Sequence, residues 1–260
     1  MSLSENKRVA ARRDAGIVNE ELEAFDAWTL SLGDGTAPVV EGENMIELPR
    51  NLCMEIDPSK QADSMGQFCE EIWPRLEENY ATAGYLEGKA ILAPTNKMVN
   101  EINNHMTRKL PGSEVVLVSA DSLTEDEDPF RFSVEYLNTL EPSGLPSHKL
   151  VVKAGMPLIL LRNINSKKGL CNGTKLIFNR VLGTTVLECS ISGDQQRKVL
   201  IPRVTLRPKE GQYGFNWARR QFPTRAAFGL TINKSQGQTL QTVGVWLAEN
   251  PCFCHGRYQH

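Results

Sequence analysis

Apolar residues in the first 148 positions follow helical spacing in some segments and extended spacing in others. Residues 18–32 place their apolar side chains on one helical face, and residues 64–80 predict a second helix that a proline bends or breaks. The run "KAILAPTN", residues 89–96, predicts a strand ending in a polar loop, and a helix with one apolar face follows over 97–110. The run "EVVLVSA", residues 114–120, predicts another strand. Together these segments predict an α/β layer.

The spacing changes at residue 149. Five short strand candidates follow at intervals of roughly ten residues, a pattern typical of a small antiparallel barrel or sandwich. A last apolar strand, "VGVWLA", comes near the end. The pattern therefore predicts an α/β layer that is interrupted by a β-rich module and then resumes. The predicted parts are an N-terminal segment, the first part of the layer, the module and the rest of the layer: residues 1–80, 81–148, 149–220 and 221–260.

Two polar loops each follow an apolar segment. The first follows the predicted strand from residue 89, whereas the segment before the second, "AAFGLTI" (residues 226–232), fits either a strand or a short buried helix. In the first, Thr95 and Asn96 occupy a helix N-cap position and Lys97 adds charge, which suits either a phosphate or a plain capped helix. The second is "TINKSQGQTL", residues 231–240, which offers neutral hydrogen-bonding groups, one lysine and a glycine. It has no histidine or carboxylate that could act as a general base. This loop therefore suits a phosphate chain or a nucleotide rather than a nucleophile.

The charge is distributed unevenly. Residues 1–148 hold 12 basic and 27 acidic residues, a net charge of −15, whereas residues 149–234 hold 16 basic and three acidic residues, a net charge of +13. A basic segment on a nearly neutral chain is typical of proteins that bind polyanions. A solvated basic face that pairs with the acidic part explains the same numbers, and composition leaves both readings open.

Several classes of protein are disfavoured by composition. No apolar run approaches the ~20 residues of a membrane span, and the N-terminus lacks an apolar signal region. The six cysteines lack the paired spacing of a zinc site, and the cluster Cys252, Cys254 and His255 has no second ligand pair. We therefore expect no membrane partner, no metal and reduced thiols. A nuclear protein is expected, with the cytoplasm or mitochondria as alternatives.

Three separated motifs resemble one family, in the order in which they occur there. The stretch "FPTRAAFGLTINKSQGQTLQTVGVWL" looks like motif V and its flanks in the petite-integration-frequency (Pif) DNA helicases of superfamily one, in a form similar to Helitron-type elements. "ILAPTNKMVNEINN" looks like the start of their second RecA-like domain, and "AGMPLILLRNINSKKGLCNGTKLIFNRV" resembles their inserted β-barrel. The resemblance implies an α/β fold: a three-layer RecA-like P-loop-NTPase-type domain interrupted by a small β-barrel.

The resemblance also implies roles for particular residues. Contacts to single-stranded DNA are implied for Thr231, Asn233, Lys234 and Ser235, and with less support for Thr95, Asn96 and Lys97. Gln236 and Gly237 are implied on the nucleotide side. The function implied is that of an ATP-dependent helicase that moves on single-stranded DNA in repair, recombination, telomere maintenance or transposition.

The chain also departs from the family. It has no GxxxxGK[ST] phosphate loop, no strand ending in Asp-Glu for magnesium, and no terminal arginine-finger motif. ATP and Mg²⁺ belong to the intact family member, and we expect this chain alone to bind neither, since the first RecA-like domain is missing. Two alternatives remain open: a non-catalytic module in which bases stack on Tyr213, Phe215 or Trp217, and a degenerate mobile-element product.

Overall fold

A computed structural model describes residues 20–39, 46, 48–54, 63–82, 84–128 and 131–247. The chain divides into two compact units, one built from residues 1–55 and 249–260 and the other from residues 56–248. In the first unit, the predicted helix spans Glu20–Asp34 (α2), and a single bridge joins Ile46 to Val39. The cluster of Cys252, Cys254 and His255 lies outside the described residues. No described helix combines the length and apolar character needed to cross a membrane.

A parallel sheet forms the base of the second unit. Its central strand is β1 (Lys89–Ala93), with β12 (Gly229–Thr231) on one side and β13 (Thr242–Val245) on the other. The helix after β1 is α5 (Asn96–Lys109), and α3 (Ser64–Ile72) precedes β1 in the chain. These elements confirm the strand–loop–helix predicted from residue 89 and the helical segment predicted from residue 64.

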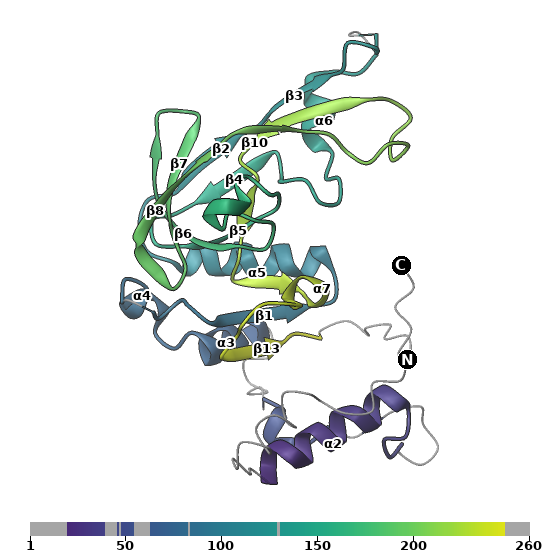
Figure 1. Ribbon diagram of the computed structural model, residues 1–260, viewed down its shortest axis with the longest axis vertical. Helices are drawn as coiled ribbons and strands as arrows, with labels where there is room; N and C mark the ends of the chain where they lie inside the picture. Colours follow the sequence, from purple (N-terminus) through teal and green to yellow (C-terminus); the bar gives the residue numbers. More distant parts are fainter. Residues whose placement is uncertain are drawn as a thin grey trace. The chain divides into compact units, whose positions relative to one another are not determined.

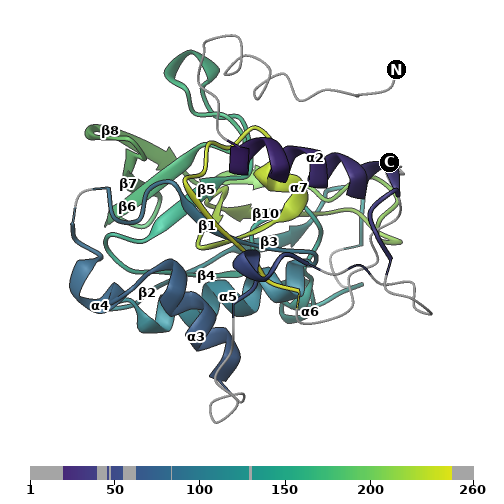
Figure 2. The ribbon, with the colours of Figure 1, turned by 90° about the horizontal axis from the view of Figure 1, so that it is seen from below.

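Both helices cover the same face of this sheet. Ile91 pairs with Gly229 on one side and with Gly244 on the other, so all three residues face the same way. The space in front of Gly229 is filled by Ile102 of α5, and that in front of Gly244 by Phe68 of α3. Figure 2 shows α3 and α5 together on one side of β1.

The other face is only partly covered, and not by a helix layer. Leu230 of β12 packs there with Ile159 and Leu161, which lie in and just after β5 (Pro157–Leu160). Val243 and Val245 of β13 remain 42% and 49% exposed. The expected three-layer RecA-like arrangement is therefore not confirmed for the described residues.

The strands after residue 149 do not close into a barrel. An open antiparallel sheet has the order β11-β5-β6-β7-β8, so β11 and β8 are its edges, as the upper part of Figure 1 shows for β5 to β8. The new strands are β11 (Thr224–Ala226), β6 (Lys175–Leu182), β7 (Val186–Ile191) and β8 (Asp194–Pro202). We call this the five-stranded sheet. The short helices α4 (Leu76–Asn79), α6 (Val134–Thr139) and α7 (Ile232–Ser235) complete the unit with η3 (Ser166–Lys168).

Two segments that were expected in the barrel, β4 (Lys149–Val152) and β9 (Val204–Leu206), pair with strands outside the five-stranded sheet. This explains why the predicted barrel is wrong. The predicted strand 114–120 is β2 (Val115–Val118), and after Ser119 it reaches only the first residue of the next strand, β3 (Ala120–Leu123). β2 pairs with β4, while β3 pairs with β10 (Trp217–Gln221), whose other neighbour is β9. Because β4 and β9 are taken by these partners, they do not join the five-stranded sheet.

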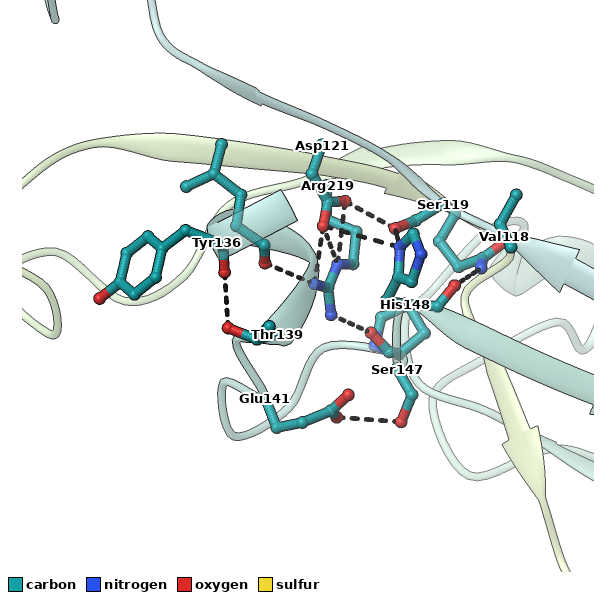
Figure 3. Close-up of polar contacts among 12 residues, drawn as sticks. Val118, Ser119, Asp121, Tyr136, Thr139, Glu141, Ser147, His148 and Arg219 are labelled. Carbon is teal, nitrogen blue, oxygen red and sulfur yellow. Dashed lines mark hydrogen bonds and ion pairs between the residues drawn. The ribbon is translucent and has the colours of Figure 1, made fainter. Parts of the chain in front are cut away.

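A buried ion pair holds β3 to β10. Arg219, which is 0% exposed, donates from Nε to both Asp121 carboxylate oxygens at 3.0 and 3.1 Å and from Nη2 to Oδ2 at 2.7 Å (Figure 3). It also donates to the carbonyl oxygens of Leu137 and Pro146, at 3.1 Å each. One side chain therefore joins two strands, helix α6 and the following loop.

Ser119 and His148 extend this network, but they do not make a hydrolytic triad. Ser119 Oγ donates to Asp121 Oδ1 at 2.7 Å and lies 2.8 Å from His148 Nδ1. In a triad the histidine bridges serine and aspartate. Here Asp121 bonds Arg219 and Ser119 directly, and His148 Nδ1 is 4.0 Å from its Oδ2. The network serves the packing of β3 and β10.

The residues expected to stack DNA bases belong to a small aromatic core. Trp217 is 1% exposed and Phe215 is buried beside Leu137, with Phe132 and Tyr213 packed against them. The Phe132 and Phe215 ring centroids are 4.1 Å apart. Stacking of bases on Phe215 or Trp217 is therefore a wrong prediction, because neighbouring rings and strands already occupy their faces.

Candidate nucleic-acid interface

The structure brings the two predicted polar loops together. Ala93, the last residue of β1, pairs with Thr231, the last residue of β12. Since the two strands are parallel and adjacent, the loops that follow them leave the same edge of the sheet. Ligands of open parallel sheets bind at this carboxyl edge. The two loops therefore line one candidate site, although 135 positions separate them in the sequence.

The first loop ends in a capped helix, as the sequence predicts. Thr95 has extended backbone angles, and its side-chain oxygen accepts a hydrogen bond from the Met98 amide at 3.3 Å. Asn96 and Lys97 lie exposed in the first turn of α5. The positive end of the helix and Lys97 both favour an anion at this position.

The second loop folds into α7 and a turn that is anchored to the five-stranded sheet. Ser235 Oγ donates to the Ile232 carbonyl at 2.7 Å, so its proton is used within α7. Gln238 Nε2 donates to the Gly173 carbonyl at 2.9 Å, which fixes the turn against the segment before β6. Asn233, Gln236 and Gly237 are exposed. Their polar groups face solvent and are free to meet a ligand.

Arg225, on β11, reaches the start of α5. Its Nη1 donates to Asn96 Oδ1 at 3.0 Å, and its Nη2 donates to the Asn96 carbonyl at 3.4 Å and to Asn100 Oδ1. All of these acceptors are neutral. The guanidinium charge at the edge of the site is therefore held in place without being neutralised.

Lys234 lies in the same positive environment. Burial lowers its pKa, and the charges of Arg225 and Arg162 lower it further. Burial also lowers the pKa of Arg225, an effect that Glu141 partly offsets. Within the described residues, none of these three cations forms an ion pair with a carboxylate. Such a cluster is suited to bind an anion.

Sequence reasoning missed three residues of this site: Arg162, Arg225 and Asn100. Arg225 stands in "FPTRAAFGL", and it entered the sequence argument only in the charge count and in the flank of the quoted motif, with no role of its own. Its partners lie more than 120 positions away, in α5. A single sequence carries no direct signal of that pairing.

Comparisons with known proteins point to the Pif1 helicases. The family model "DNA helicase Pif1, 2B domain" matches residues 135–181, from α6 to the last residues of β6. Human ATP-dependent DNA helicase PIF1 is 25% identical over 198 residues, covering 72% of this chain and 28% of the human protein. The chain resembles the C-terminal portion of a Pif1-type helicase. The Helitron-like subtype stays a prediction.

Two further Pif1 proteins show how far the likeness extends. The Pif1 helicase of Bdellovibrio bacteriovorus is 25% identical over 149 residues, covering 57% of this chain and 31% of that protein. The crystal structure of Pif1 helicase from Candida albicans matches at 22% identity with a TM-score of 0.50, over 75% of this chain and 45% of that one. The fold is therefore of the Pif1 type. The chain spans about a third or less of the length of these curated relatives.

Proposed function

We propose that this chain is the C-terminal part of an ATP-dependent DNA helicase and that the carboxyl edge of its parallel sheet binds single-stranded DNA. One observation carries the proposal. Two loops from neighbouring strands converge at that edge with three cations that have no carboxylate partner among the described residues. Backbone phosphates dominate the affinity of proteins for nucleic acids, and such a cluster suits them.

Each predicted residue takes a role consistent with its position. Contacts to the DNA backbone are proposed for Thr95, Asn96, Lys97, Thr231, Asn233, Lys234 and Ser235. Ser235 would act as an acceptor, because its own proton is bonded to Ile232. Gln236 and Gly237, exposed beyond α7, are proposed to face the nucleotide.

The residues present do not fit a complete ATP–magnesium site. The sequence has no phosphate loop, and the described residues hold no cluster of three histidine, cysteine or acidic side chains that could bind a metal. We therefore propose that the chain alone hydrolyses no ATP, and that a first RecA-like domain supplies these parts in the whole protein. Roles in repair, recombination, telomere maintenance or transposition, and a nuclear location, remain proposals. The alternatives are a non-catalytic DNA-binding module or a degenerate mobile-element product.

Two assays on the purified chain test this proposal together. Labelled oligo-dT should bind in fluorescence anisotropy, with an affinity that falls steeply as salt rises, because binding releases counterions. ATP hydrolysis should stay at the level of buffer with or without the oligonucleotide. Hydrolysis that is stimulated by DNA and survives further purification would contradict the account of the missing parts. Affinity that does not change with salt would contradict the proposed interface.

A further inference from the structure

Arg162 and Arg225 reach the DNA site from the five-stranded sheet, not from the parallel sheet. Arg225 lies on β11, where its neighbours Thr224 and Ala226 pair with Leu160 and Leu158 of β5. The Leu161 amide donates to the Pro223 carbonyl at 2.8 Å, which places the next residue, Arg162, at the adjoining end of β5. Lys234 belongs to α7, which directly follows β12 of the parallel sheet. Three cations from two sheets therefore meet at one junction.

Arg225 is oriented by its hydrogen bonds and has donors to spare. Nη1 and Nη2 are held by Asn96 and Asn100, whose oxygens carry no formal charge. The Nε–H and one N–H of Nη1 have no hydrogen bond to any described residue. A guanidinium fixed in this way presents its remaining donors in a constant direction, which matches the oxygens of a phosphate.

The positive charges of this cluster repel one another until an anion binds. Burial and the neighbouring guanidinium charges both disfavour the charged form of Lys234 and lower its pKa. A basic group whose pKa is lower in the folded state than in the unfolded state destabilises the fold at every pH where it is charged in both states. A phosphate bound between the three side chains would favour their charged forms and so stabilise the fold.

We propose that Arg162, Arg225 and Lys234 form a single phosphate-binding subsite, with two ligands from the five-stranded sheet and one from the parallel sheet. The inference rests on the proposed function, because it assigns two further residues to the same DNA site. The chemistry recognised is a phosphate group, from a DNA backbone or from free phosphate. Asn96 and Asn100 act as positioning residues for Arg225.

The test compares Arg162→Gln and Arg225→Lys with Arg207→Gln, which removes an exposed positive charge after β9. Melting temperatures are measured at low ionic strength alone, with pyrophosphate, and with oligo-dT, at matched ionic strength. Without ligand, Arg162→Gln should melt at or up to about 2 °C above wild type, because it relieves repulsion. Both site variants should bind oligo-dT about tenfold more weakly and lose most of the stabilisation by ligand, whereas Arg207→Gln should behave like wild type. Arg225→Lys retains the charge, so its loss of affinity reports the fixed guanidinium.

The outcomes separate this subsite from the proposed function. If wild type binds oligo-dT with a steep salt dependence and both site variants match Arg207→Gln, the subsite is wrong and the DNA-binding proposal stands. If pyrophosphate stabilises wild type through these residues but oligo-dT does not bind, the subsite is supported and the DNA proposal fails. Arg162 is exposed, so Arg162→Gln keeps the test valid even if Arg225→Lys does not fold.

Discussion

Replacing Arg219 with methionine is expected to lower the free energy of unfolding by about 3–5 kcal/mol. The substitution leaves the fully buried Asp121 side chain without its countercharge. It also removes the donors to the carbonyl groups of Leu137 and Pro146, which tie α6 and the next loop to β10. Urea or thermal unfolding followed by circular dichroism measures the loss.

A second variant distinguishes the ion pair from general packing. In Arg219→Met/Asp121→Leu both buried charges are gone, and much of the lost stability should return, since paired apolar residues often replace a buried ion pair at little cost. A single variant that loses less than about 1 kcal/mol would show that the pair does not hold β3 to β10. A double variant as unstable as the single one would assign the effect to shape rather than charge.

Replacing Gly237 with valine is expected to weaken binding of oligo-dT by about 10- to 100-fold while the fold is kept. Gly237 has a φ of +77°, a region in which a β-branched residue is strained by about 1–3 kcal/mol. No atom outside the neighbouring residues lies within 4 Å of a Cβ built at this position, so the added Cβ itself has room. The strain should therefore change the loop around α7 rather than the core.

Gly183→Val is the matched control. Gly183 has a φ of +61° and equally open surroundings, but it lies in the turn between β6 and β7. It should lose a similar amount of stability and keep its affinity for DNA. If Gly237→Val unfolds the protein, or if both variants lose affinity equally, the glycine serves packing rather than the ligand.

Local patterns correctly predicted the strand and the capped helix on either side of the first loop. The strand from Lys89, the cap at Thr95 and the apolar face of α5 depend on residues only a few positions apart, so the sequence carries them directly. In these features neighbouring residues determine the backbone conformation. The pattern left the segment before residue 231 open between a strand and a short buried helix, and the structure shows a strand, β12.

The remaining features could not be predicted, because they depend on which distant segments pair in the fold. Nothing local shows that "EVVLVSA" ends where the chain leaves β2, which pairs with β4, and enters β3, which pairs with β10. Trp217 looks like an exposed stacking residue beside "ARRQ", yet α6 and Phe215 cover it. Arg225 gains its role only when β11 brings it to Asn96 and Asn100. Phe215 is close to Trp217 in the sequence and the residues of β4 lie 31–37 positions from their partners in β2, whereas the other partners lie about 80 or more positions away.

The salt dependence of oligo-dT affinity for Lys234→Ala tests the central claim most directly. Lys209→Ala is the control, because Lys209 is an exposed lysine in the loop that leads to β10. If Lys234 meets a backbone phosphate, its variant should bind more weakly on all sequences, and the slope of log affinity against log salt should become shallower by about 0.7–1. Lys209→Ala should match wild type in both. Unchanged affinity and slope for Lys234→Ala would contradict the account and leave the loop after β12 as a turn without a nucleic-acid contact.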